Sequence, residues 1–174
     1  YTVSCVPDQF GEHAQFADVL AIDPYGKPSK AADWLPKAVA AVNGTKPVIC
    51  VPGSFGKDET PEEIRATAYL ALAHDARGII WYPWEQVGGG PVGVGAKNSP
   101  EQQAAIASVC EDVKQLLPWL TAPVRQSFAS EDGNLRCLYM RHQRAVILMV
   151  NPTDQVLKAE AQLPPAHPSA EKTK

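Results

Sequence analysis

The chain has 174 residues, of which 45% are hydrophobic and 20% charged, and its formal net charge is −3 at pH 7. This is the composition of an ordinary globular protein and excludes disorder over the whole chain, because it provides enough apolar surface for a core. The mildly acidic balance argues against nucleic-acid binding, which requires a basic surface, and no apolar run reaches the ~18–20 residues of a membrane span.

The first 120 residues alternate between short apolar runs and segments with helical signals. The apolar runs are continuous, which is typical of parallel strands buried on both faces. A strand–helix unit recurs about every 30 residues, and this predicts right-handed βαβ crossovers in one parallel sheet. Strands are expected at residues 1–6, 18–22, 47–51 and 78–82, and helices at 7–16, 31–42, 60–76 and 99–118.

Capping residues support the expected helix ends. Asn43 and the glycine after it are typical of a helix C-terminus. Thr60 is followed three residues later by Glu63, the spacing of a capping box, with a proline at the first helical position between them. Ser99 and Gln102 have the same spacing, so the same reciprocal box is expected at the start of the last helix.

The pattern changes after residue 121. Short strand candidates are separated there by turn clusters, which predicts a meander that belongs to a small antiparallel sheet or sandwich over residues 122–163. Residues 164–174 contain prolines and charged residues and are interpreted as a flexible tail or linker. The expected strands of the meander are residues 124–130, 135–142, 145–150 and 156–163.

The residues that directly follow the apolar runs are the candidates for function, because the loops after parallel strands meet at one edge of the sheet. Aromatic rings offer flat faces to the C–H faces of a sugar, and two carboxylates across a cleft can cut a glycosidic bond. Glu85 and Asp23 are therefore the candidate catalytic residues, with Asp8 as a weaker candidate. The candidate substrate-binding residues are Tyr25, Ser54, Phe55, Trp81, Tyr82, Trp84 and Gln86.

Three stretches of the chain, FADVLAIDPYGKP, KPVICVPGSFG and TPEEIRATAYLALAHDARGIIWYPWEQ, carry a resemblance. Together they resemble the closing units of the (β/α)8-barrel glycoside hydrolases and their relatives, over roughly residues 10–160. The resemblance implies that residues 1–121 are the C-terminal half of a TIM barrel, formed by four βα units, with a β-sandwich portion after it. It also implies hydrolysis of a carbohydrate at the carboxyl ends of the strands.

The sequence departs from that family at two places. Many retaining members carry a nucleophilic Glu after the seventh strand, whereas the loop after residues 47–51 here reads Pro52, Gly53, Ser54, Phe55. The strand that usually carries the acid/base Glu has no counterpart in this chain. A closed barrel also needs about 250 residues. The expected partners are therefore a carbohydrate and a complementary N-terminal half-barrel polypeptide or missing segment.

No cofactor or metal is expected, because the histidines are isolated and no metal-ligand spacing occurs. Two alternatives to a hydrolase stay open. One is a catalytically inactive carbohydrate-binding module on the same scaffold. The other is a flavodoxin-like doubly wound domain that binds a phosphate ligand at the glycine-rich loop of residues 88–95, for which a flap over the cleft is the favoured interpretation. Export of the protein to the periplasm or the cell exterior is expected from the class of enzyme alone.

Overall fold

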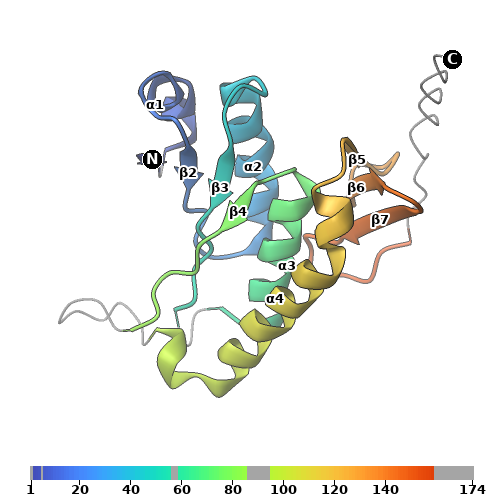
Figure 1. The fold of residues 1–174 in the computed structure, drawn as a ribbon. Helices are drawn as coiled ribbons and strands as arrows, with labels where there is room; N and C mark the ends of the chain where they lie inside the picture. Colours follow the sequence, from blue (N-terminus) through green and yellow to red (C-terminus); the bar gives the residue numbers. More distant parts are fainter. Residues whose placement is uncertain (1, 5, 56–58, 86–94, 159–174) are drawn as a thin grey trace, which may run out of the picture.

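The computed structural model describes residues 2–4, 6–55, 59–85 and 95–158. It is a mixed α/β structure that contains a four-stranded parallel sheet and a three-stranded antiparallel sheet (Figure 1). The strands of the parallel sheet lie in chain order, and every neighbouring pair is parallel. They are β1 (Thr2–Ser4), β2 (Leu20–Ile22), β3 (Val48–Cys50) and β4 (Gly78–Ile79).

The helices that connect these strands pack on each other in the same order, α1 on α2, α2 on α3 and α3 on α4. Right-handed crossovers in a sheet with monotonic strand order place all helices on one face. This arrangement does not fit the flavodoxin-like alternative, because a doubly wound sheet reverses its strand order and carries helices on both faces. The helices are η1 (Pro7–Gln9), α1 (Phe10–Phe16), α2 (Pro28–Val42), α3 (Pro61–Ala73), η2 (Ala96–Asn98) and α4 (Pro100–Leu120).

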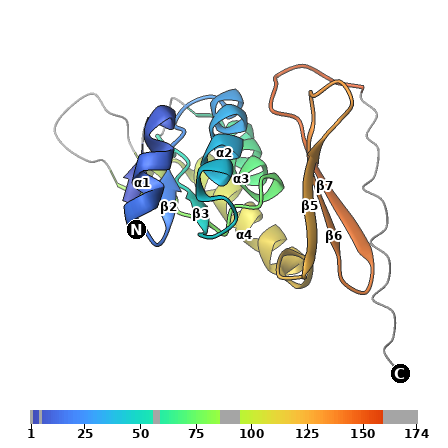
Figure 2. The same cartoon turned by 90° about the horizontal axis from the view of Figure 1, so that it is seen from above.

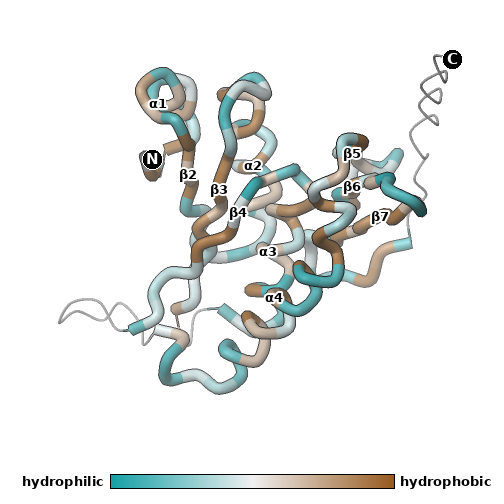
Figure 3. Tube along the Cα trace, in the orientation of Figure 1, coloured by the Kyte–Doolittle hydropathy of each residue, from teal (hydrophilic) through white to brown (hydrophobic). Residues whose placement is uncertain are grey.

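The main core lies between the parallel sheet and this helical layer. Leu20, Ile22, Val48 and Cys50 point into it and are buried against side chains of α1, α2 and α3. The strands β3 and β4 are coloured as hydrophobic where they pass the helices in Figure 3. Over the described residues, no helix is long and apolar enough to cross a bilayer. The predicted parallel sheet with helical connections is confirmed, but the predicted burial of its strands on both faces is wrong in part, because Val3 of β1 is 42% exposed and β4 is only half-buried.

The predicted helix caps are confirmed at two sites and partly wrong at the third. Asn43 ends α2 with a left-handed φ of 47°, and Thr60 and Glu63 form the reciprocal capping box of α3. At α4, Ser99 accepts from the Gln102 backbone N–H at 3.4 Å, but the Gln102 side chain does not complete the box. Its Nε2 donates instead to the backbone oxygen of Glu59 at 2.8 Å, because this side chain is buried.

The meander is confirmed for three of its four expected strands. β5 (Val124–Ala129), β6 (Arg136–Arg141) and β7 (Ala145–Val150) form an antiparallel sheet in chain order. The fourth strand is not observed at residues 156–158, and residues 159–174, which include the expected tail, lie outside the described part. Val150 belongs to the same core cluster as the helices. Helix α3 contacts β3 on one side and β6 and β7 on the other, between the two sheets (Figure 2).

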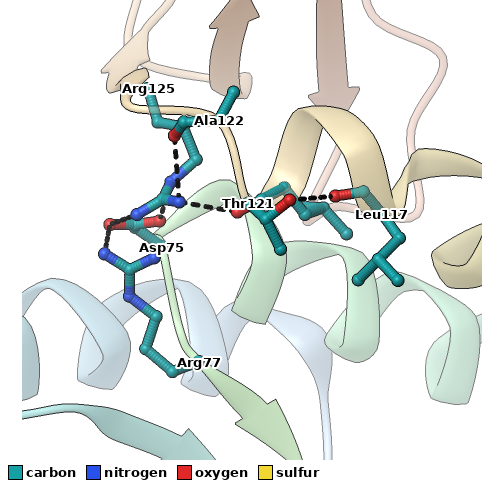
Figure 4. Close-up of polar contacts among 7 residues, drawn as sticks. Asp75, Arg77, Leu117, Thr121, Ala122 and Arg125 are labelled. Carbon is teal, nitrogen blue, oxygen red and sulfur yellow. Dashed lines mark hydrogen bonds and ion pairs between the residues drawn. The ribbon is translucent and has the colours of Figure 1, made fainter. Parts of the chain in front are cut away.

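A half-buried arginine, Arg125, joins the two parts of the chain at the turn between α3 and β4 (Figure 4). Asp75 follows the C-cap of α3 with a φ of 60°, and its carboxylate accepts from Arg125 Nε at 2.9 Å. The same guanidinium donates to the backbone oxygens of Leu120 at 2.6 Å and Ala122 at 3.2 Å. Arg77 reaches the other Asp75 oxygen at 3.1 Å from the solvent side. Arg125 therefore ties the start of β5 to the end of α3 and of α4.

Candidate functional site

Three of the predicted binding residues meet at the carboxyl edge of the parallel sheet. Tyr25, Phe55 and Tyr82 come from the segments after β2, β3 and β4. The ring centroids of Tyr25 and Phe55 lie 5.1 Å apart in an edge-to-face arrangement, and those of Tyr25 and Tyr82 lie 5.9 Å apart with nearly parallel planes. Phe55 meets Tyr82 edge-on at 6.0 Å. We call these three residues the aromatic cluster; Tyr82 keeps 39% of its surface exposed.

Main-chain pairing beyond β3 and β4 holds the cluster in place. The Ser54 backbone N–H donates to the backbone carbonyl oxygen of Tyr82 at 2.7 Å, and the Ser54 hydroxyl donates to the backbone carbonyl oxygen of Pro83 at 2.9 Å. Ser54 is fully buried, so its hydroxyl serves this loop-to-loop contact and not a ligand. Gly95 pairs with Phe55, and a side chain at Gly95 would overlap the carbonyl oxygens of Pro83 and Trp84. Glycine is required there by the close approach of the backbones.

A buried carboxylate that the sequence interpretation missed lies beneath the cluster. Glu59 Oε1 accepts from the Gly26 N–H at 3.0 Å, and Oε2 accepts from the Phe55 N–H at 2.9 Å. A Cβ added at Gly53 would overlap this carboxylate, which explains why glycine occupies that position. Glu59 directly precedes the helix cap Thr60, where a solvated acidic residue is the ordinary expectation, so no local signal distinguishes it.

The candidate catalytic residues Glu85 and Asp23 lie in contrasting environments. Glu85 is exposed, and its Oε1 pairs with Lys97 Nζ at 2.6 Å. This hydrogen bond and the positive charge of Lys97 lower the pKa of the Glu85 carboxyl. Asp23 is buried at the end of β2. The pKa of the Cys50 thiol is raised to about 12, chiefly by burial and further by the negative charge of Asp23, so the two side chains are close enough to interact.

Trp81 and Tyr82 point to opposite sides of the chain after β4, as their adjacent positions predict. Tyr82 joins the aromatic cluster, whereas Trp81 lines a groove of about 570 Å3 between β4 and α4. This groove is lined mainly by apolar residues, among them Ile79, Val109 and Leu117. Its charged residues, Asp75, Arg77 and Arg125, belong to the junction described above. It does not include the aromatic cluster, so we place the candidate site at the cluster, where the loops of three strands meet.

The remaining candidates lie apart from the cluster or outside the description. Trp84 is exposed beyond Tyr82, and Asp8 is exposed in η1. Gln86 and residues 88–94 of the glycine-rich loop lie outside the described residues. Within the described ranges, no three His, Cys, Asp or Glu side chains are grouped in a way that could hold a metal ion.

Comparisons with known proteins give no further guide to the site. The sequence matches no protein-family model, and searches of curated proteins and of solved structures found no similar chain. The interpretation of the site therefore depends on its own geometry and chemistry.

Proposed function

We propose that this chain binds a carbohydrate at the aromatic cluster, as part of a glycoside hydrolase-like protein. The observation that carries the proposal is the convergence of Tyr25, Phe55 and Tyr82 from three successive loops at the carboxyl edge of a parallel sheet. Carboxyl edges are where α/β proteins bind their ligands. A partly exposed group of aromatic rings suits a ligand with apolar C–H faces, and a sugar ring has such faces.

The electrostatic environment of Glu85 suits one of the two roles that carboxylates take in hydrolysis. A general acid needs a raised pKa, whereas a nucleophile or base must be ionised. The lowered pKa of Glu85 keeps this carboxylate ionised and so assigns it the nucleophile or base role. Asp23, which is buried directly after β2 in the same sheet, stays the other candidate catalytic carboxylate.

The second candidate function is binding without hydrolysis. It is favoured by the exposure of Glu85 and its ion pair with Lys97, because a solvated and paired carboxylate is a weak nucleophile. In that case the aromatic cluster would retain its role and Glu85 would serve only to hold the segment that follows β4.

Titration with hexasaccharides tests the proposal. We expect the chain to bind at least one of cellohexaose, xylohexaose, mannohexaose and chitohexaose in isothermal titration calorimetry. Tyr82→Ala should weaken that affinity about tenfold, the order expected when one stacking ring is lost. Phe16→Ala is the matched control, because Phe16 is an aromatic residue of α1 that is 84% exposed and outside the cluster.

Absence of binding to the whole panel, or equal losses in the two variants, would overturn the carbohydrate proposal. Glu85→Gln then separates the two candidate functions. If Glu85→Gln no longer hydrolyses the hexasaccharide but still binds it with the wild-type affinity, the result supports hydrolysis by Glu85. If the wild-type chain binds a hexasaccharide and does not hydrolyse it, the result supports the binding module.

We further propose that the parallel sheet is one half of a (β/α)8 barrel and that a complementary half-barrel covers its open face. In the described part of the chain, the helices and the antiparallel sheet pack on one side of the parallel sheet. Strand alternation places Val3, Ala21 and Ile49 on the opposite side, with Ile80 directly after β4; Val3 and Ile80 are 42% and 45% exposed, whereas Ala21 between its neighbours is buried. β1 and β4 each pair with only one described strand, so both edges can accept a further parallel strand.

The chain without such a partner is expected to self-associate at micromolar concentration, because an uncovered apolar sheet with open edges promotes pairing between molecules. Sedimentation velocity measures this directly. Ile80→Lys should shift the distribution towards the monomer, while Met149→Lys, at an exposed apolar position on β7, should leave it unchanged. A monodisperse monomer that binds no hydrophobic dye would contradict the half-barrel proposal.

A further inference from the structure

We infer that Glu59 is a positioning residue: its carboxylate fixes the relative position of Tyr25 and Phe55 by binding one backbone N–H from each of their loops. The consequence for sugar affinity rests on the proposed function, whereas the effect on the two loops does not. Glu59 lies 33 residues from Gly26 and only four from Phe55, so its two hydrogen bonds join segments that are distant in the sequence.

The geometry gives each carboxylate oxygen its own donor. Oε1 binds the N–H of Gly26, the residue next to Tyr25, at 3.0 Å, and Oε2 binds the N–H of Phe55 at 2.9 Å. Hydrogen bonds to an ionised acceptor are stronger than those between neutral groups, and burial of the carboxylate protects them from water. The two rings whose backbones are held in this way have their centroids 5.1 Å apart.

The surroundings allow the carboxylate little freedom to take another position. Gly53 leaves space for it that any side chain would fill. The backbone oxygen of Glu59 is itself held by Gln102 Nε2 from α4 at 2.8 Å. The loops after β2 and β3 and the start of α4 are thus connected through a single residue. A neutral amide in place of the carboxylate would present an NH2 group to one of the two N–H donors and lose that bond.

Glu59→Gln tests this inference, with Glu62→Gln as the matched control. Glu62 is an exposed carboxylate three residues further on, so its loss changes the charge equally without touching the loops. The test is made in the Ile80→Lys background, where self-association is expected to be suppressed and a chain of 18.8 kDa is accessible to amide-resolved NMR. In Glu59→Gln, we expect hydrogen exchange at Gly26 and Phe55 to accelerate about tenfold or more, as for the loss of a protecting bond. The nuclear Overhauser contacts between the Tyr25 and Phe55 rings should weaken in the same variant.

Hexasaccharide affinity should fall about tenfold in Glu59→Gln, the effect expected for one lost charge-assisted hydrogen bond. Gly53→Ala should reproduce the exchange and affinity changes from the other side, because it displaces the carboxylate without removing its charge. Unchanged exchange at Gly26 and Phe55 in both variants overturns the inference, whether or not sugar binds. Altered exchange with full sugar affinity refutes the role in binding and leaves the proposed function standing. If the wild-type chain binds no sugar, the proposed function fails, and the exchange data alone decide the role of Glu59.

Discussion

Arg125→Met is expected to lower the free energy of unfolding by about 2–3 kcal/mol. The Arg125 side chain is only 13% exposed and binds the Asp75 carboxylate and two carbonyl oxygens at the end of α4. Methionine preserves much of the apolar stem and removes all of these hydrogen bonds. The partly buried carboxylate and carbonyls then lose donors that water replaces only in part, which costs more than the loss of a surface ion pair.

Arg77→Met provides the comparison on the same carboxylate. Arg77 contacts Asp75 through one nitrogen, and its side chain is 47% exposed. An exposed ion pair of this kind contributes less than about 1 kcal/mol. Urea denaturation of the two variants measures the difference. Equal and small losses would show that Arg125 is an ordinary surface cation and that the antiparallel sheet is held to α3 by apolar contacts alone.

Lowering the pH from 6.5 to 5 should remove about 1.5 kcal/mol of stability through His74. Burial, with a further contribution from the positive charge of Arg136, lowers the pKa of His74 from 6.5 to about 4. The unfolded chain therefore takes up a proton below pH 6.5, whereas the folded chain stays unprotonated at this site until about pH 4. The contribution is fully present above pH 6.5, declines as the pH falls, and is exhausted below pH 4.

His74 is the C-cap of α3, where a helix ordinarily favours a positive charge. Burial outweighs that preference, and His74 Nε2 is buried with no hydrogen-bond partner among the described residues. His74→Gln removes the titrating group, so its unfolding free energy should vary less between pH 6.5 and 5 than that of the wild-type chain. Restricting the measurement to this interval keeps most carboxylates ionised. Parallel pH profiles for the two proteins would show that His74 titrates normally in the folded state.

Much of the parallel sheet was predictable because its signals are local. The continuous apolar runs, the Asn43 C-cap and the Thr60–Glu63 box each depend on residues within one turn or strand. The convergence of Tyr25, Phe55 and Tyr82 was also predictable, because parallel strands in chain order bring their following loops to one edge. The resemblance to glycoside hydrolases and the roles of Glu85 and Asp23 stay predictions.

The tertiary structure decided which hydrogen bonds the polar side chains form at that edge of the sheet. The sequence around Ser54 and Glu59 gives no signal that distinguishes them. Only the approach of neighbouring loops shows that the Ser54 hydroxyl joins two loops and that the Glu59 carboxylate accepts from two backbone N–H groups. The spacing of Gln102 from Ser99 predicts a reciprocal capping box. In the structure the Gln102 side chain donates to the buried backbone oxygen of Glu59 instead, because a buried carbonyl needs a hydrogen-bond donor.

The sequence by itself determined the order and type of the four strand–helix units and of three strands of the meander, because periodicity and capping act over a few residues. It also predicted that Tyr25, Phe55 and Tyr82 would gather after the strands, although other predicted site residues lie elsewhere. Only the tertiary structure decided that Val150 of the antiparallel sheet shares the core of the helical layer, and that Arg125 bridges to a turn 50 residues away. These contacts join segments distant in the chain, and no local pattern specifies them, because burial of a polar or apolar group depends on what packs against it from elsewhere.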